Sequence, residues 1–218
     1  MAQPSGPTAA LAGVPTGLQS QGVWVGRRQL FVRFAAEAET ATMYTAAAIA
    51  SELKKTAARS VFHSISIGGR DPLSNLEFLE IALRHGPMPL PVMLDVDGQR
   101  PEGVAKLTSF LALVQVTLEG AALEPLLERA MQSIRVAADA GVEHAVVLSP
   151  SDQTSDGQML RVVEQAHSVS ERSTVVIHPP QNTPIDRDRR WVMLVERSAG
   201  MHKDVRLALR LPPPTGTR

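Results

Sequence analysis

Residues 61–96, VFHSISIGGRDPLSNLEFLEIALRHGPMPLPVMLDV, contain the pattern that decides the fold. Residues 61–67 alternate apolar and polar side chains and stop at a pair of glycines, which is typical of a strand that runs into a loop. Residues 75–84 carry leucines and an isoleucine at helical spacing, and residues 91–96 read as a second strand. A strand, a helix and a strand in this order indicate parallel strands joined by a helix.

The same alternation continues along most of the chain. The predicted strands are residues 29–34, 61–67, 91–96, 111–118, 145–148 and 174–177, and the predicted helices are residues 45–58, 75–84, 123–140 and 157–168. This order predicts an α/β fold with a parallel sheet covered by helices. About six βα units are fewer than the eight of a full (β/α)8 barrel, so we expect a partial (β/α) barrel of about six parallel strands.

In such a sheet, ligands bind outside the carboxyl ends of the strands. The segments that follow the predicted strands are therefore the first places to look for a site. They are residues 35–44, 68–74, 95–100, 117–120 and 149–156.

The two ends of the chain differ in composition from the middle. Residues 1–17 contain three Pro, three Gly and no charged side chain, so we expect a flexible arm and no targeting signal. Residues 18–186 are predicted to form the barrel. Residues 187–218 contain eight Lys and Arg against three Asp and Glu, and we expect residues 190–197 and 205–211 to pair as an added C-terminal β-hairpin.

The basic C-terminal extension is also the predicted partner surface. Arg206 and Arg210 alternate with apolar residues, which gives the predicted strand one apolar and one basic face. The hairpin either packs its apolar side on the barrel with both arginines in water, or it offers a sheet edge to another chain. We place the partner surface on these two arginines, which would select an acidic protein.

Composition excludes several classes of function. The chain has 218 residues, 22 Lys and Arg against 22 Asp and Glu, and no Cys. Zero net charge argues against a general nucleic-acid binder, and no apolar run reaches the ~20 residues of a membrane-spanning helix. The lack of Cys excludes disulfides and thiolate-held metal centres. We expect a soluble, cytoplasmic protein.

Short motifs, taken in order, resemble those of the radical S-adenosylmethionine (SAM) superfamily, and within it the 7-carboxy-7-deazaguanine synthase family. The matching segments are residues 18–26 (LQSQGVWVG), 30–34 (LFVRF), 67–69 (IGG), 94–98 (LDVDG), 116–117 (VT), 147–150 (VLSP) and 176–178 (VIH). The resemblance covers roughly three-quarters of the chain. It implies a radical SAM-like partial barrel and a homodimer.

The resemblance also implies binding residues. The implied pocket for SAM or another ligand consists of Gly68, Gly69, Thr117 and Ser149. Arg33 and Gln21 are the implied contacts to a substrate carboxylate. Each residue has a structural interpretation as well: we favour a pairing of Arg33 with Asp95 or Asp97, and we interpret His178 as a structural strand-end residue rather than a general base.

The departures from the family pattern fall on its chemistry. The family's loop after the first strand carries three cysteines, and by position Glu37, Ala41 and Tyr44 replace them. These side chains cannot supply three thiolates, so we expect no iron–sulfur cluster and no reductive cleavage of SAM. We expect no metal site, although Glu37 and Glu39 leave a divalent cation in this loop as an alternative.

Three functions follow from the resemblance and stay open. We favour a non-catalytic pseudoenzyme without a cofactor, which serves as a structural or regulatory scaffold for a protein partner or a second copy of itself. The alternatives are a binding module for SAM, a pterin or a deazaguanine, and an altered lyase-type enzyme of the queuosine or 7-deazaguanine pathway. No catalytic residue is assigned.

Overall fold

The computed structural model describes residues 6–37, 39–120, 123–181, 183–185 and 187–211. The strands are β1 (Thr8–Leu11), β2 (Thr16–Leu18), β3 (Arg28–Phe34), β4 (Thr42–Thr45), β5 (Ser64–Gly69), β6 (Val92–Val96), β7 (Leu113–Glu119), β8 (Glu143–Ser149), β9 (Thr174–Ile177) and β10 (Val205–Leu207). The helices are α1 (Ala46–Ala57), α2 (Leu76–Arg84), α3 (Pro101–Leu107), α4 (Leu123–Asp139), α5 (Asp156–Val169) and α6 (Arg189–Ala199). Two short 3₁₀ turns, η1 (Pro72–Asn75) and η2 (Thr108–Phe110), precede α2 and follow α3.

The strands form one mostly parallel sheet. Its order is β10-β9-β8-β7-β6-β5-β3-β1-β4, and β2 pairs with β3 beside this path. Strands β3 and β5 to β10 are parallel to one another, whereas β1, β2 and β4 run antiparallel to their partners. The predicted α/β fold with a large parallel sheet and helices is confirmed. The sheet path is open, because β10 and β4 stand at its two ends.

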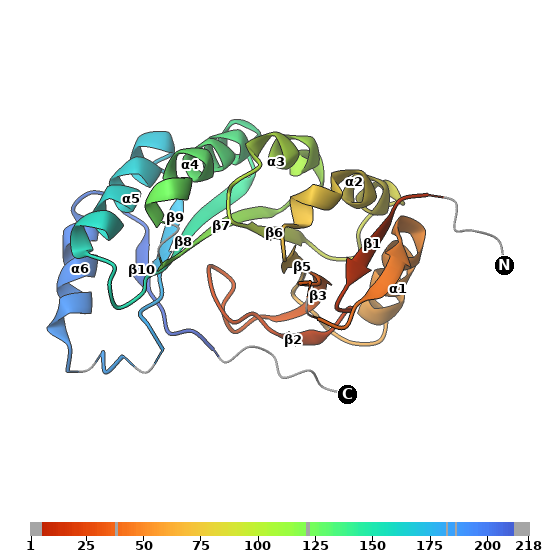
Figure 1. Ribbon diagram of the computed structural model, residues 1–218, viewed down its shortest axis with the longest axis horizontal. Coiled ribbons are helices and arrows are strands. Elements are labelled where there is room, and N and C mark those ends of the chain that lie inside the picture. The colour runs from red at the N-terminus through yellow and green to blue at the C-terminus, as the bar shows by residue number, and fades with distance from the viewer. Residues whose placement is uncertain (1–5, 38, 121–122, 182, 186, 212–218) are drawn as a thin grey trace.

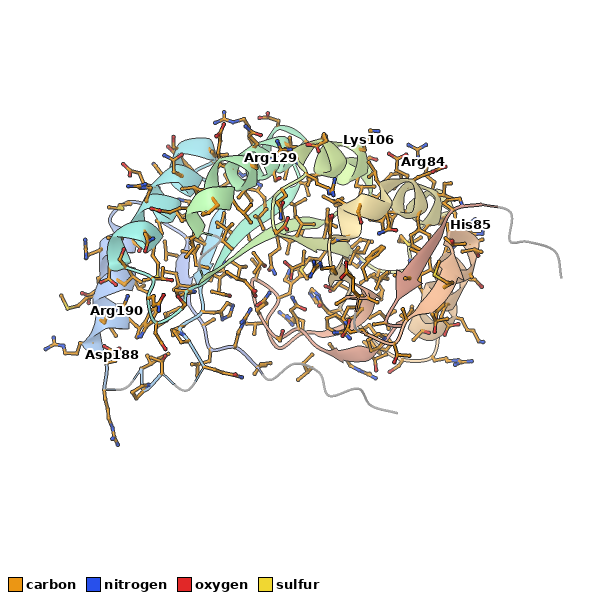
Figure 2. All side chains as sticks on the ribbon, viewed as in Figure 1. Arg84, His85, Lys106, Arg129, Asp188 and Arg190 are labelled. Atoms are coloured by element: carbon orange, nitrogen blue, oxygen red, sulfur yellow. The ribbon has the colours of Figure 1, made fainter. Side chains whose placement is uncertain are left out.

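One face of the sheet is apolar and lies under the helices. Leu30 and Val32 of β3, Leu94 of β6 and Val146 of β8 are buried in the main core together with apolar residues of all six helices. Figure 1 shows α2 to α6 along the convex side of the curved sheet. Charged side chains of these helices point away from the sheet, as Figure 2 shows for Arg84, Lys106 and Arg129.

The opposite, concave face is largely polar. Because side chains alternate along a strand, the neighbours of the core residues point to this side. They include Gln29, Arg33, Ser64, Ser66, Asp95, Gln115, Thr117, Ser149 and His178. The loop between β2 and β3 reaches across this face (Figure 1), and its Val23 and Trp24 pack on Met93, Leu113 and Ala145.

The helix starts follow from local sequence. Thr45 caps α1 by accepting a hydrogen bond from the backbone N–H of Ala48 at 3.2 Å. Ser155 and Gln158 form a capping box at the start of α5. These contacts satisfy N–H groups that have no partner inside the helix, so both helices begin where the sequence predicts them.

The predicted flexible N-terminal arm is wrong for the part of it that the structure describes. β1 and β2 lie in the sheet, Ala9 and Leu11 are buried, and Leu11 pairs with Phe34. Residues 1–5 lie outside the described part of the chain. A lack of charge, which suggested a flexible arm, equally suits a strand whose alternate side chains enter the core.

The predicted C-terminal hairpin is also wrong. Residues 190–197 belong to α6, in which Trp191, Leu194 and Ser198 recur at helical spacing and are buried. β10 then pairs with β9 in parallel, so α6 is the crossover of another strand–helix–strand unit. A run rich in large apolar residues fits the two-residue repeat of a strand as well as the 3.6-residue repeat of a helix. Its burial against the sheet selects the helix.

Two contacts fix the start of α6. The carboxylate of Asp188 accepts a hydrogen bond from the backbone N–H of Arg190 at 3.0 Å. The guanidinium of Arg190 binds Asp156, the first residue of α5, with 2.7 Å between Nε and Oδ1. Figure 2 shows Asp188 and Arg190 together at this end of the molecule.

The docking of α6 can be tested with Trp191→Ala. Trp191 is 2% exposed and belongs to the main core, so its truncation should lower the free energy of unfolding by about 3–5 kcal/mol. Val192→Ala on the exposed side of the same helix should change it by less than about 0.5 kcal/mol. Urea denaturation measures both, and equal effects would show that α6 does not pack as described.

Candidate functional site

Two adjoining cavities open on the concave face at the carboxyl ends of the central strands. One has a volume of about 380 Å³ and is lined by residues of β3, β5 and β6 together with the segment before β3. The other has a volume of about 440 Å³ and is lined by residues that follow β5, β6 and β7. Both are lined by Gln21, Gly69 and Asp95, so these three residues mark the centre of the site.

Asp95 supplies the partly buried acid of this centre. Its side chain points to the concave face near the end of β6, where the hydroxyl of Thr117 donates a hydrogen bond to Oδ1 at 2.7 Å. Burial raises the pKa of the Asp95 carboxyl above its ordinary value, and the nearby Glu119 raises it further. The hydrogen bond from Thr117 and the amides of Gln115 and Gln21 act in the opposite direction. The net result is a carboxyl that holds its proton to higher pH than an exposed Asp.

Sequence reasoning named Asp95 only as a partner for Arg33, and it missed Gln115, which pairs with Asp95 in the sheet without lining either cavity. Gln115 is fully buried, and its Oε1 accepts a hydrogen bond from the backbone N–H of Val23 at 3.2 Å. Its Nε2 makes no hydrogen bond of ordinary geometry to the described residues, although the amide lies near enough to the Asp95 carboxyl to lower the pKa of that group. A glutamine in the apolar strand at residues 113–119 was the available signal, because a buried polar group needs a partner.

The loop between β2 and β3 approaches this site closely. Gly22 has a φ of +81°, and a Cβ at this position would lie 1.8 Å from Oε1 of Gln115. Glycine suits this position for two reasons. A side chain would collide with the Gln115 amide, and residues with a Cβ rarely adopt this left-handed backbone conformation.

His178 holds the loop in place. Its Nε2 accepts a hydrogen bond from the backbone N–H of Gly22 at 2.8 Å, and its Nδ1 donates one to the carbonyl of Ala208 at 2.7 Å. These partners fix the neutral tautomer, since an N–H can only donate and a carbonyl can only accept. Burial lowers the pKa of His178, and the adjacent Arg210 lowers it as well. Both contacts agree with the interpretation of His178 as a structural residue, which stays a prediction.

Arg210 turns toward the site and does not form a free outer surface. Its guanidinium donates to Oε1 of Gln21 from both Nε and Nη2, and Nη2 also lies 2.8 Å from Oε1 of Glu119. Arg206 binds the carboxylate of Asp204 through two hydrogen bonds of 2.8 Å. Both arginines predicted as an acidic-partner surface therefore already have acidic neighbours within the chain.

Arg33 does not make the contact that we favoured. Its Nη2 lies 2.7 Å from Oε1 of Glu39, and no ion pair with Asp95 or Asp97 is found among the described residues. The backbone N–H of Ala36 also binds Glu39, and together these groups hold the pKa of Glu39 below its ordinary value. Arg33 does not pair with Asp95 because its guanidinium binds Glu39, in the loop that follows β3.

The loop predicted as a degenerate cluster site does not gather its residues. Glu37 is exposed after β3, Ala41 is exposed before β4, and Tyr44 lies within β4, where it pairs with Ala9. None of them lines the cavities described above. The segment forms a strand because β1 offers it a partner, which the sequence pattern did not reveal.

The other predicted site residues do meet at one end of the sheet. Gly68, Gly69, Arg33 and Gln21 line the first cavity, and Thr117 lines the second. Ser149 lines a neighbouring cavity of about 380 Å³ that also contains Gln21 and Arg210. Their placement follows from the common edge formed by the carboxyl ends of parallel strands. A ligand role for them stays a prediction.

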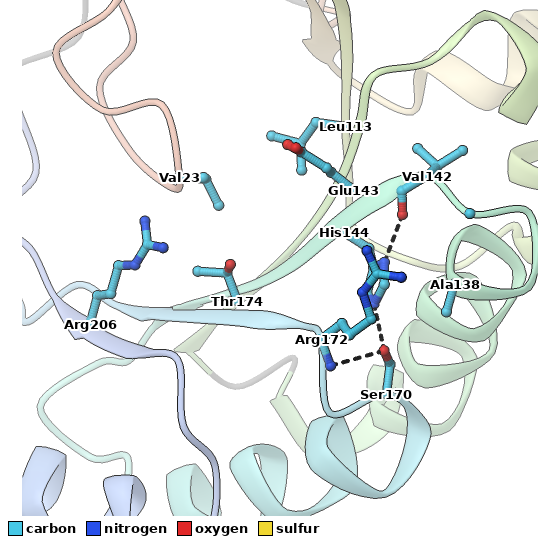
Figure 3. A pocket seen from close by; sticks show the side chains of 11 residues that line it. Val23, Leu113, Ala138, Val142, Glu143, His144, Ser170, Arg172, Thr174 and Arg206 are labelled. Atoms are coloured by element: carbon cyan, nitrogen blue, oxygen red, sulfur yellow. Dashed lines mark hydrogen bonds between the residues drawn. The ribbon is translucent and has the colours of Figure 1, made fainter.

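A separate cavity of about 340 Å³ lies at the opposite, amino ends of β7 to β9 (Figure 3). Its central residue, His144, donates from Nδ1 to the carbonyl of Val142 and accepts at Nε2 from the hydroxyl of Ser170, both at 2.8 Å. Ser170 in turn accepts from the backbone N–H of Arg172 at 3.3 Å. These polar groups bind one another, which indicates a structural role for this corner.

Neither a metal-binding cluster nor a membrane-crossing helix is found among the described residues. No group of three or more His, Cys, Asp or Glu side chains in that part of the chain is placed to hold a metal ion. No helix within it has the length and apolar character needed to cross a membrane. The cytoplasmic location stays a prediction.

Comparisons with known proteins give little for assigning a family. No family model and no curated protein sequence matches the chain. Among solved structures, the chain is similar to the apo form of 3-keto-D-glucoside 4-epimerase from E. coli, with 14% sequence identity and a TM-score of 0.41. The similarity covers 80% of this chain and 78% of that one. At this level it assigns neither a family nor an activity.

The predicted radical SAM identity is wrong. No family model, that of the radical SAM superfamily included, matches the chain. The radical SAM-derived scaffold, the binding module for SAM, a pterin or a deazaguanine, and the queuosine-pathway enzyme lose their basis with it, as does the homodimer inferred from that family. The motifs that suggested it are short strand ends and glycine turns, which recur wherever parallel strands meet loops.

Proposed function

We propose that the protein is an acid–base enzyme that moves a proton next to a carbonyl group of a small polar substrate, with Asp95 as the proton carrier. The observation that carries this proposal is the Asp95 carboxyl, whose pKa is raised by burial at the carboxyl end of a central parallel strand and which lines two cavities. A general acid or base works best when its pKa lies near the working pH, and an ordinary Asp is too acidic for this.

The surrounding groups supply the other parts of such a reaction. In the forward step, the Asp95 carboxylate takes a proton from the carbon beside the carbonyl, and the electron pair of that C–H bond moves to the carbonyl oxygen. We infer that Gln115 Nε2, which is buried beside Asp95 without a hydrogen bond of ordinary geometry to the described residues, donates to the negative oxygen that forms. Return of the proton from Asp95 to carbon or oxygen completes the step without another reactant.

The lining limits the substrate. Cavities of about 380 and 440 Å³ suit a small molecule. Ser66, Thr117 and Gln21 offer hydroxyl and amide groups, and Gly68 and Gly69 leave the backbone open to close approach. These groups favour a substrate that carries hydroxyl or carbonyl oxygens over an aromatic or aliphatic one.

This proposal includes the finer description of the fold. We infer that the curved sheet is a partial (β/α) barrel whose mouth is the ligand site, which agrees with its open strand order and outer helices. Function without a cofactor, in the cytoplasm and with a protein partner remains a proposal from the sequence.

The reaction can be tested by hydrogen exchange into substrates. The protein is incubated in D₂O with hydroxyketones, ketoses and 2-oxo acids, and loss of the proton beside the carbonyl is followed by ¹H NMR. We expect exchange with at least one class, and Asp95→Asn should reduce its rate by a factor of at least about 100, as for loss of a general base. Asp139→Asn, the same change on the outer helix α4, should leave the rate unchanged.

Gln115→Leu, which removes the amide donor but keeps a side chain of similar size, should also slow the exchange. No exchange with any compound class, or exchange that survives in Asp95→Asn, would contradict the proposed reaction.

The raised pKa of Asp95 also predicts how stability depends on pH. The unfolded chain releases this proton near the ordinary Asp pKa of about 3.9, whereas the folded protein holds it to higher pH. The charged carboxylate therefore costs stability as the pH rises above this value. Asp95→Asn should be more stable than the wild type at pH 7, and the difference should shrink as the pH falls toward 4. Urea denaturation at several pH values measures this, and a difference that grows toward acid pH would refute the raised pKa.

A further inference from the structure

The cavity beside Ser149 and Arg210 contains hydrogen-bond donors without acceptors. It has a volume of about 380 Å³ and lies at the carboxyl ends of β8 and β9, and Gln21 connects it to the cavities around Asp95. The hydroxyl of Ser149 is buried and has no hydrogen-bond partner among the described residues. A buried hydroxyl without a partner is unfavourable in a folded protein, so it points to a ligand group that completes it.

Arg210 adds a charged donor to the same cavity. Its Nε and Nη2 bind Gln21 and Glu119, and none of the described residues accepts a hydrogen bond from its Nη1. Three other lining residues, Pro150, Pro179 and Pro180, lack a backbone N–H, so side chains supply the donors at this part of the wall. His178 brings no positive charge, because its neutral tautomer is fixed by Gly22 and Ala208.

The ion pair between Arg210 and Glu119 is easily replaced. The side chain of Glu119 is 64% exposed, and such exposed ion pairs are weak. Gln21, in contrast, holds the guanidinium from the site side, and the N–H of Leu211 binds the carbonyl of Ser20 at 2.9 Å. Arg210 is thus kept at the cavity while its bond to Glu119 can exchange for another anion.

We propose that Ser149 and Arg210 form a subsite for an oxyanion, a carboxylate or a phosphate, on the ligand of this protein. An oxyanion has only acceptors and a negative charge, which matches a cavity that offers a hydroxyl and a guanidinium. That this anionic group belongs to the molecule on which Asp95 acts rests on the proposed function. The subsite itself does not depend on it.

The test uses two simple probes, inorganic phosphate and acetate, with sodium chloride at equal ionic strength as the reference. Isothermal titration and the thermal midpoint report binding to the full chain. We expect binding of at least one probe, and the better probe identifies the group as phosphate or carboxylate. No binding of either probe would overturn the subsite.

Three variants of charged residues test whether the effect belongs to the proposed subsite. Arg210→Gln should weaken binding about tenfold or more, as for loss of a charge-assisted hydrogen bond. Glu119→Gln should strengthen binding, because it removes the competing carboxylate, and misfolding cannot produce that result. Arg206→Gln, a matched loss of charge in the same segment, should have no effect. Equal weakening in Arg206→Gln and Arg210→Gln would show that general charge, not a subsite, attracts the probe.

Ser149→Ala separates binding from folding. Because the hydroxyl has no partner in the free protein, its removal should leave the thermal midpoint without anion unchanged or raised, while it weakens anion binding by a few fold. A lower midpoint together with unchanged binding would contradict the subsite.

Asp95→Asn should still bind the probe, even though it should lose the proton exchange. Exchange without anion binding would retain the proposed reaction and reject the subsite, and anion binding without exchange would do the opposite.

Discussion

The register between the parallel strands assigns each side chain of the sheet to one of two faces. Asp95 pairs with Gln115, and Gln115 pairs with Ala145, so residues that share a register position stand in one row across the concave side. Their sequence neighbours form rows of Val, Leu and Ile on the other side, where the helices exclude water from them. The apolar rows give the fold its stability. The polar rows are then gathered on the face without helices, and this arrangement creates the site.

The concave face is completed by two segments that are far apart in sequence. The loop before β3 enters over Gln115, and the chain after β10 passes beside it. His178 joins them, because one ring nitrogen accepts from Gly22 and the other donates to Ala208. The imidazole is thus a buried connection between the first and last parts of the described chain. Arg210 and Gln21 can meet at the mouth of the site only because this connection holds both segments.

Local pattern predicted most central elements well, although it missed α3, and it predicted the terminal elements poorly. Strands such as β5 and β6 and helices such as α4 lie close to their predicted places, because their periods of burial are distinct. Residues 190–197 were predicted as a strand, because a run of large apolar residues is compatible with strand and helix spacing alike. Only packing against the sheet decides between the two. β1 and β4 were missed because each becomes a strand only beside the other. The resemblance of short motifs to a known superfamily misled the functional reading, because glycine turns at strand ends occur in many parallel sheets.

The sequence by itself determined an α/β chain with parallel strands, and it pointed to the strand ends where Gly68, Gly69 and Thr117 lie. These properties depend on periodicity and turn chemistry, which are local. Only the tertiary structure decided that Asp95 is partly buried beside Thr117 and Gln115, that His178 is held as a neutral connection between two segments, and that Arg210 faces inward. Each of these depends on contacts between residues distant in sequence, and burial by such contacts is what changes the chemistry of an ordinary carboxyl or imidazole.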